Sequence, residues 1–249
     1  MKKMLRCLGM TLCLCIAFAW NTSAFGQGLT IYTEEYGPWN YTMDGQITGM
    51  ATEIVQEIMN RTGNNYPIQS VPWARGYSAL VEEPNVMLYS TVRTREREEL
   101  GLQWVGPLGM LRNVFLQKSG ADNNIESFED ARKVGKIGVY ADTVFEQTLR
   151  SAEFENLEVV HSAVLAMRML MAGRVDLVML EEGAALMIAQ DEGFDPDGFE
   201  VAFVYEEMPM YLAFSRQTDA SIVAEWDQAF QAMLNDGTAQ EISDRYFAP

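Results

Sequence analysis

Four arginines lie close together in a chain that is otherwise strongly acidic. Arg93, Arg95, Arg97 and Arg112 fall within 20 positions, whereas the 249-residue chain carries 18 basic and 35 acidic side chains and a net charge of −17. A guanidinium group offers paired N–H donors that match a carboxylate. The stretch before them, "NVMLYS" (85–90), is typical of a strand, and ligands of open α/β sheets bind beyond the carboxyl ends of strands. The arrangement predicts a site for an anionic group.

A competing interpretation is that "RTREREE" begins a solvated helix in which arginines and glutamates pair with one another. We favour this interpretation for Arg95, which has acidic neighbours, because exposed ion pairs of this kind contribute little. For Arg93 and Arg97 we favour a role in binding.

Aromatic residues follow two other predicted strands. "EEYGPWNY" contains Tyr36 and Trp39, and "VPWARGY" contains Trp73 and Arg75. Both loops should leave the same edge of one parallel sheet, where aromatic rings can cover the apolar part of a small ligand or stack on a cation. The alternative is that Trp39 and Trp73 only plug the edge of the sheet, as large aromatic residues often do.

Strand and helix periods alternate along almost the whole chain, which predicts an α/β architecture. A first set comprises strands at 29–33, 66–71 and 85–90 and helices at 50–63 and 73–82. A second set comprises strands at 136–140, 157–160, 175–180 and 201–205 and helices at 143–151, 163–173 and 183–190. The helical tail at 219–247 carries an apolar stripe that must pack on one of these two lobes.

The first 26 residues have the pattern of a secretory signal peptide. They combine a basic start, an apolar run and small residues near position 24, and they contain all three cysteines. An uncleaved anchor is the alternative, but the apolar run is shorter than the roughly 20 residues of a membrane span. We therefore expect a mature protein without disulfides, located in the periplasm.

Composition excludes several classes of protein. The acidic charge disfavours nucleic acid and anionic lipid as partners. With His161 as the only histidine, and with the cysteines in the predicted signal peptide, neither a metal site nor a cofactor is expected. What remains is an exported protein, expected to be a monomer, with a small-molecule or protein partner.

The ordered set "IYTEEYGPWNYTMDGQITGMATEIVQEI", "VPWARGY", "STVRTREREELGLQWVGPLG", "KIGVYADT", "AGRVDLVMLEE" and "DGTAQEISDRYF" resembles the family 3 extracellular solute-binding proteins, which deliver polar amino acids to ABC importers. The resemblance implies a two-lobed periplasmic binding protein fold (type II), with two hinge crossings and a ligand cleft between the lobes. The expected division is lobe 1 at 27–111, lobe 2 at 112–208, and a return to lobe 1 at 209–249. The implied partner is an ABC permease in the inner membrane.

The resemblance also implies roles for individual residues. Tyr36 matches the aromatic residue that covers the ligand side chain, and Arg97 matches the arginine that grips an α-carboxylate. Thr143 matches a threonine at a helix start of the second lobe, and Glu181 an acid that receives the α-amino group. The strand-end residues that would bind the polar head of the ligand are Tyr89, Ser90 and Thr91.

Three departures from the family pattern affect these expectations. Asp142 and Val144 flank Thr143, and Asp142 as a helix cap would repel a carboxylate. Glu182 follows Glu181, so either carboxylate could face the cleft. Arg75 and Arg93 add positive charge, which suggests a ligand more anionic than a neutral amino acid.

Two other functions are compatible with the same fold. An enzyme would need a general acid or base with a shifted pKa, for which Glu34, Glu35 and Glu181 are the candidates. A sensory partner would bind a similar ligand and report to a membrane kinase. The binding protein of an importer is the function that we favour.

Overall fold

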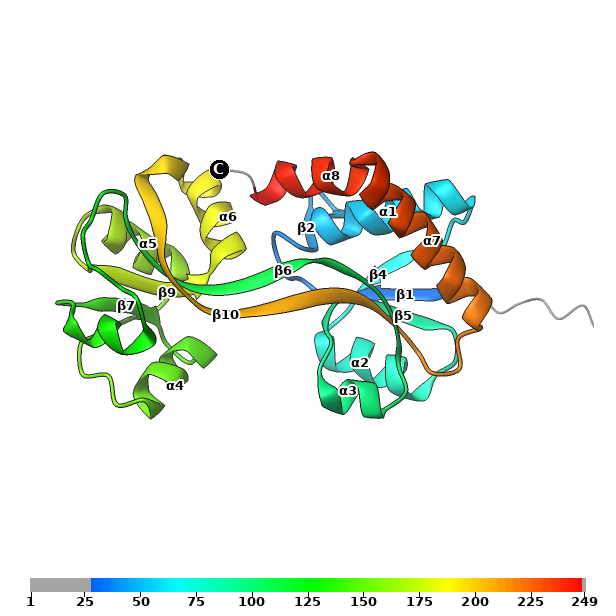
Figure 1. Ribbon diagram of the computed structural model, residues 1–249, viewed down its shortest axis with the longest axis horizontal. Helices are drawn as coiled ribbons and strands as arrows, with labels where there is room; N and C mark the ends of the chain where they lie inside the picture. Colours follow the sequence, from blue (N-terminus) through cyan, green and yellow to red (C-terminus); the bar gives the residue numbers. More distant parts are fainter. Residues whose placement is uncertain (1–27, 248–249) are drawn as a thin grey trace, which may run out of the picture.

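Two long antiparallel strands cross the whole molecule and join two lobes (Figure 1). The computed structural model describes residues 28–247, and the crossing strands are β6 (Gln103–Lys118) and β10 (Phe199–Phe214). Within the described residues, the main sheet has the strand order β4-β1-β5-β10-β6-β9-β7-β8. The first lobe lies on the β4 side of the crossing strands and the second on the β8 side. The predicted two-lobed α/β fold is confirmed.

The first lobe is a parallel sheet with helices on both faces. Its strands are β1 (Thr30–Thr33), β4 (Ile68–Ser70) and β5 (Val86–Val92), and its helices are α1 (Met50–Thr62), α2 (Trp73–Glu82) and α3 (Arg95–Glu99). A small hairpin, β2 (Tyr41–Met43) and β3 (Gln46–Thr48), turns through Asp44 and Gly45, both with positive φ. Gly63, the last residue of the predicted helix at 50–63, ends α1 in the left-handed conformation that glycine adopts without strain.

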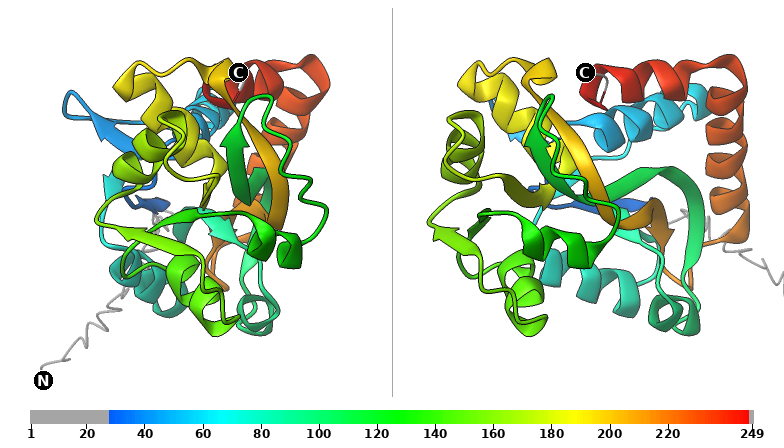
Figure 2. Two further views of the ribbon diagram at one scale, coloured as in Figure 1. Left: turned by 90° about the vertical axis from the view of Figure 1, so that its left-hand side faces the viewer. Right: turned by 60° about the vertical axis from the view of Figure 1, so that its left-hand side comes forward.

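The C-terminal helices pack on this lobe (Figure 2). They are α7 (Ala220–Asp236) and α8 (Thr238–Phe247). Trp226, Phe230 and Met233 of α7 are buried in the same hydrophobic cluster as the apolar face of α1. The exact lobe boundaries given above stay a prediction.

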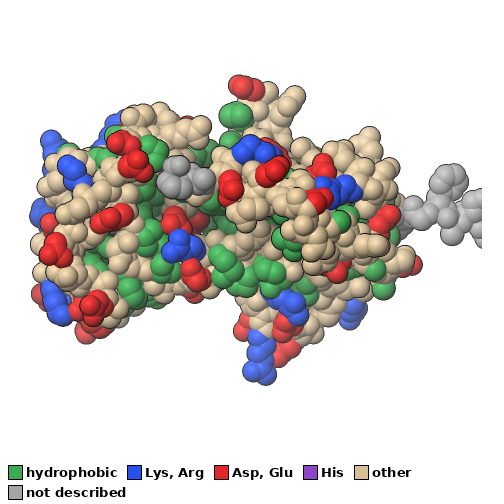
Figure 3. All heavy atoms as spheres, turned by 45° about the horizontal axis from the view of Figure 1, so that its top comes forward, with side chains coloured by type: hydrophobic (Ala, Val, Ile, Leu, Met, Phe, Trp, Pro, Cys, Tyr) green, Lys and Arg blue, Asp and Glu red, His purple; other side chains and the backbone are tan. Residues whose placement is uncertain are grey.

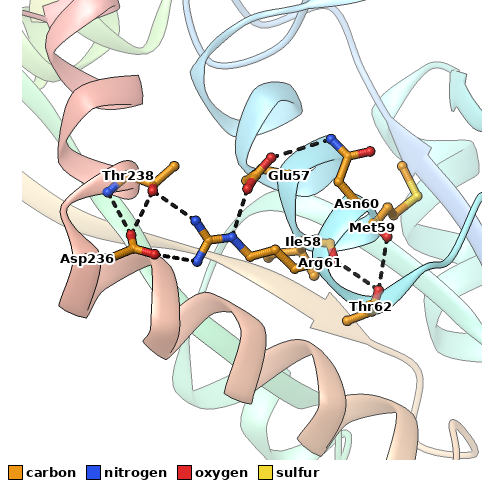
Figure 4. A network of polar contacts seen from close by, with 8 residues as sticks. All are labelled: Glu57, Ile58, Met59, Asn60, Arg61, Thr62, Asp236 and Thr238. Atoms are coloured by element: carbon orange, nitrogen blue, oxygen red, sulfur yellow. Dashed lines mark hydrogen bonds and ion pairs between the residues drawn. The ribbon is translucent and has the colours of Figure 1, made fainter.

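A polar network fixes the junction of α7 and α8 to the end of α1 (Figure 4). Arg61 of α1 donates from Nε to Glu57 at 2.8 Å, from Nη1 to Asp236 at 2.7 Å and from Nη2 to the Thr238 hydroxyl at 2.9 Å. The arginine holds the pKa of the Asp236 carboxyl down at about 2. These bonds tie a segment near the end of the chain to a helix near its beginning.

The second lobe has its own sheet and core. Its strands are β7 (Ile137–Tyr140), β8 (Leu157–Val160) and β9 (Leu177–Glu181), its α-helices are α4 (Val144–Ser151), α5 (Ala163–Met171) and α6 (Glu182–Glu192), and two short 3₁₀ helices span Phe128–Lys133 and Pro196–Gly198. Ser162 accepts a hydrogen bond from the Leu165 amide and caps α5. Met167 of α5 is fully buried in this core.

The crossing strands were the elements least predictable from the sequence. No strand was expected over 103–118, and only 201–205 was expected of the strand that runs over Phe199–Phe214. Gly106, Pro107 and Arg112 in β6 and Pro209 in β10 interrupt the apolar alternation on which a strand prediction depends. The two strands nevertheless pair along almost their entire length, which compensates for their weak individual patterns.

The remaining predictions concern the signal peptide, a membrane span and metal binding. The signal peptide at residues 1–26 lies outside the described residues. Within residues 28–247, no helix combines the length and the apolarity that a membrane crossing requires. No group of three or more His, Cys, Asp or Glu side chains in this part of the chain could hold a metal ion.

Candidate functional site

A cleft of about 510 Å³ lies between the two lobes. Both lobes and both crossing strands contribute to its wall. The lining residues are Glu34, Tyr36, Trp73, Ser90, Val92 and Arg97 from the first lobe, Leu111, Asn113, Met208 and Met210 from the crossing strands, and Tyr140, Val144, Phe145, Leu180, Glu181 and Ala184 from the second lobe. The cleft therefore brings together elements that are far apart in the sequence.

Arg97 lines the cleft from the first lobe. Its Nη1 donates to the Val92 carbonyl oxygen at 2.5 Å, and its guanidinium carbon lies 5.1 Å from the ring centre of Trp73 and 5.3 Å from that of Tyr77. The two rings stack on each other, with centroids 5.6 Å apart. Among residues 28–247, Arg97 makes no ion pair with a carboxylate. Val92, Trp73 and Tyr77 therefore hold the Arg97 guanidinium in place without neutralising its charge.

The other predicted arginines lie outside the cleft lining. Arg93 pairs with Glu98 at 2.7 Å, and its guanidinium carbon is 5.8 Å from the ring centres of Trp104 and Tyr211. Arg75 is exposed on α2 and does not line the cleft.

Arg95 is almost fully exposed and pairs with Glu99, as the sequence suggested. Arg112 pairs with Glu182 and Glu207 on another face of the crossing strands. Because Arg75 and Arg93 do not line the cleft, the structure gives no reason to expect a ligand more anionic than a neutral amino acid.

Glu181 contributes a buried carboxylate to the cleft. Only 5% of the residue is exposed, because it ends β9 and begins α6 inside the second-lobe core. Its two oxygens accept hydrogen bonds from the amides of Gly183 at 3.0 Å and Ala184 at 2.7 Å. Burial raises the pKa of Glu181 to about 7, although the two amide hydrogen bonds act in the opposite direction. Of the two adjacent glutamates, Glu181 faces the cleft, and Glu182 faces Arg112.

Glu34 adds a second carboxylate on the first-lobe side. It is half-buried, and burial raises the pKa of its side chain. Within the described residues its carboxylate has no hydrogen-bond or ion-pair partner, although its backbone carbonyl accepts from Asn40. Glu35 differs: it points away from the cleft and accepts hydrogen bonds from Thr42 and Ser70, which lower its pKa.

Aromatic rings make up much of the cleft wall. Tyr36 and Trp73 line it from the first lobe, and Tyr140 and Phe145 from the second. Burial raises the pKa of the Tyr36 and Tyr140 phenols, and Glu181 acts in the same direction on Tyr36. Both phenols are therefore neutral hydrogen-bonding groups over the physiological range. Trp39, by contrast, is 1% exposed and packs in the first-lobe core, with its ring centre 5.1 Å from that of Phe247.

Only one of the three strand-end residues lines the cleft. Ser90 does so in a backbone conformation with φ of 58°, which is uncommon for a residue with a side chain, and its hydroxyl donates to Asn40. Tyr89 is buried, with its hydroxyl 3.0 Å from that of Thr52. Thr91 is also buried and donates to the Leu88 carbonyl group at 3.1 Å.

The start of α4 differs from the expectation for Asp142. Thr143, not Asp142, caps the helix, because its hydroxyl accepts from the Glu146 amide at 3.3 Å. The hydroxyl also donates to the Tyr140 carbonyl group at 2.8 Å, and Thr143 is not among the residues that line the cleft. Asp142 has a φ of 63° and donates from its amide to Glu146. Val144, 65% exposed, lines the cleft instead.

The part of the wall that comes from the crossing strands was not predicted from the sequence. Leu111 and Asn113 on β6, and Met208 and Met210 on β10, line the cleft at a spacing of two residues. Alternate residues of a strand face the same side. Recognition of 103–118 as a strand would have put Leu111 and Asn113 on one face, which is the signal that could have found them.

Comparison with known proteins adds to this geometry. Residues 29–249 match the model of the bacterial extracellular solute-binding proteins, family 3. The chain is 24% identical over 215 residues to a probable amino-acid ABC transporter-binding protein of Haemophilus influenzae, covering 85% of this chain and 81% of that one. It is 25% identical over 223 residues to the L-cystine-binding protein of Bacillus subtilis, covering 88% and 81%.

Solved structures share the fold at lower identity. An ancestral cationic amino acid solute-binding protein superposes with a TM-score of 0.71 at 19% identity, covering 88% of this chain and 95% of that one. Substrate-binding domain 2 of Lactococcus lactis GlnP gives a TM-score of 0.70 at 16% identity, covering 89% and 95%. Because the family model spans nearly all of the described residues, the predicted family is confirmed: the chain belongs to the bacterial extracellular solute-binding proteins, family 3.

Proposed function

We propose that this protein binds an amino acid outside the cytoplasmic membrane and presents it to the permease of an ABC importer. The family and the names of the relatives, an amino-acid transporter-binding protein and an L-cystine-binding protein, support this role. The observation that carries the proposal is the cleft between the lobes, in which an arginine that forms no ion pair within the described part of the chain accompanies two carboxylates. An amino acid has the complementary charges.

In the proposed complex, Arg97 binds the α-carboxylate through the N–H groups that Val92 does not occupy. Glu181 receives the α-amino group, while Tyr36 and Trp73 cover the ligand side chain from the first lobe. Val144 and Phe145 provide the apolar wall opposite. Because these groups belong to both lobes, ligand binding favours a closed arrangement that brings them together.

The charges of the cleft favour a ligand with a second positive group. Among residues 28–247, Arg97 is the one basic side chain that lines the cleft, whereas Glu34 and Glu181 are both acidic. A neutral amino acid would leave the Glu34 carboxylate half-buried without a counterion, which is unfavourable. We therefore propose a cationic amino acid, such as L-arginine or L-lysine, whose side-chain cation lies near Glu34 and the aromatic rings.

The test is a thermal-shift and calorimetric comparison of the protein beginning at Gln27 with L-arginine, L-lysine, L-glutamine, L-glutamate and cadaverine. A ligand at 100 times its Kd stabilises the native state by about 2.7 kcal/mol. We expect L-arginine or L-lysine to stabilise the protein and cadaverine, which lacks a carboxylate, to fail. Arg97→Ala should abolish the shift, while Arg95→Ala, a surface control, should retain it. A shift with L-glutamate alone would contradict the proposed ligand class.

An enzyme on the same fold is the second candidate, because Glu181 has the raised pKa that an acid–base catalyst needs. The two relatives named above are binding proteins, which supports the first candidate. The two functions are separated by following any stabilising ligand by NMR during prolonged incubation with the protein. Conversion to a product that requires Glu181 would replace the binding-protein proposal.

A further inference from the structure

The two faces of the crossing strand β6 line different cavities. Leu111 and Asn113 line the ligand cleft, whereas the alternate residues Met110 and Arg112 line a smaller hollow of about 210 Å³. The hollow is otherwise lined by Trp39, Met50, Gly109, Glu182, Leu186, Ser243 and Phe247. Because successive side chains of a strand point to opposite sides, the cleft and this hollow lie on opposite faces of β6.

On the face away from the cleft, the two lobes touch through glycines. A Cβ atom on Gly183 of α6 would lie 2.7 Å from Cε1 of Phe247 and 2.8 Å from Cδ of Pro38, both in the first lobe. A Cβ atom on Gly37 of the first lobe would lie 2.5 Å from Sδ of Met187 on α6. We call these five residues the rear contact. Figure 1 places the ends of α6 and α8 side by side at this point.

A charged bridge beside the rear contact ties α6 to the crossing strands. Arg112 donates from Nη1 to Glu182 of α6, at 2.6 and 2.8 Å, and from Nε to Glu207 of β10 at 2.9 Å. The face seen in Figure 3 carries acidic and basic side chains over both lobes, with apolar side chains between them. The side chains of the bridge are partly exposed, so we expect each ion pair to contribute modestly.

We infer that the rear contact opposes closing of the ligand cleft and thereby sets ligand affinity; this inference rests on the proposed function. The crossing strands connect the lobes and lie between the cleft and the rear contact. Bending about these strands to close the cleft must move α6 away from Pro38 and Phe247 on the opposite face. The packing at the rear contact exists only before the cleft closes and stabilises the unclosed arrangement. Ligand binding must overcome this stabilisation.

Gly183→Ala is the sharpest change for testing this inference. Gly183 lies in the first turn of α6 without a positive φ, so alanine suits its backbone and has the higher helix propensity. The added methyl group meets the rigid Pro38 ring rather than the free end of a flexible side chain. It should therefore separate the lobes at the rear and shift the population towards the closed cleft.

The first measurement needs no ligand. The three cysteines all precede residue 27, so a protein that begins at Gln27 accepts two spin labels, at Arg95→Cys on α3 and Arg150→Cys on α4. Both side chains are mostly exposed and stand on different lobes. Pulsed EPR should give a shorter distance between labels in Gly183→Ala than in the parent. An unchanged or longer distance overturns the inference. Gly28→Ala is the matched control, because its Cβ meets only Tyr66 at 3.5 Å, an ordinary contact.

A second variant removes atoms instead of adding them. Met187→Ala deletes the side chain that packs on Gly37 and takes away stabilisation of the unclosed arrangement. Met187→Ala should also shorten the distance between the two labels, although it removes atoms from the rear contact whereas Gly183→Ala adds them. If Gly183→Ala fails to fold, Met187→Ala still tests the inference. A longer distance between the labels in Met187→Ala would contradict it.

The affinity measurement uses L-arginine as the probe. Gly183→Ala should bind it more tightly than the parent, on the order of 5-fold, which is typical of a coupling between two states. A weaker affinity together with a shortened distance would refute the link between closure and binding. If the parent binds none of the amino acids tested, the proposed function fails, while the EPR distances still decide the role of the rear contact.

Discussion

At the scale of single residues, Arg97 is held by two aromatic rings and one carbonyl group. Trp73 lines the cleft, but Tyr77 does not, and it reaches the ligand site only through the Arg97 guanidinium and the Trp73 ring. Tyr77→Leu should weaken binding of L-arginine about 3-fold, the loss of one cation–π contact at a partly exposed site. Calorimetry would measure it. Tyr77→Phe, which keeps the ring, should bind like the parent, and a comparable loss in this control would contradict the role given to the ring.

The buried carboxylate of Glu181 gives a second prediction at this scale. Burial raises its pKa to about 7 from 4.5, so the folded protein binds more protons than the unfolded chain between these pH values. Stability should therefore fall as pH rises from 4.5 to 7, by up to about 3 kcal/mol from this group. Glu34 acts in the same direction, because its pKa is also raised. Urea titrations of the ligand-free protein at pH 5 and pH 8 would measure the difference.

Glu181→Gln provides the control for this pH dependence. Glutamine keeps an oxygen that can accept from the Gly183 or Ala184 amide but carries no charge at either pH. The variant should lose part of the difference in stability between pH 5 and pH 8. An undiminished difference would assign the effect to other groups, with Glu34 as the next to test.

At the scale of elements, the sequence was informative where one strand or helix carried its own pattern. The alternating strands and helices of each lobe and the helical tail were all predicted from local periodicity. The crossing strands were not, because their glycines, prolines and charges are acceptable only when β6 and β10 pair with each other. Pairing between residues about 100 positions apart leaves little trace in a local window.

The same distinction applies to the cleft. Arg97, Tyr36 and Trp73 line the wall beyond strand ends that the sequence indicated, whereas Ser90 and Glu181, which also line it, were expected only from the resemblance to the family. Strand ends alone did not show that Arg93 and Arg75 lie outside the cleft lining. Arg93 pairs with Glu98 and lies near two aromatic rings of the crossing strands, which were not predicted.

Several further side chains of the wall depend on how the lobes meet. Leu111, Asn113, Met208 and Met210 face the cleft only because β6 and β10 run between the two lobes. No spacing within one lobe encodes that proximity.

At the scale of the whole molecule, the acidic charge, which is −17 for the full sequence, acts on any charged ligand before contact. A negative potential around the cleft should attract a cationic amino acid and accelerate its association, and salt should screen this attraction, since the Debye length falls from about 30 Å at 0.01 M to about 10 Å at 0.1 M. We expect the association rate of L-arginine, measured by stopped-flow tryptophan fluorescence, to fall severalfold over this range. L-glutamine, neutral overall, is the control and should associate at nearly constant rate if it binds. A rate for L-arginine that is independent of salt would mean that the potential at the cleft differs in sign or size from that implied by the net charge, and would weaken the case for a cationic ligand.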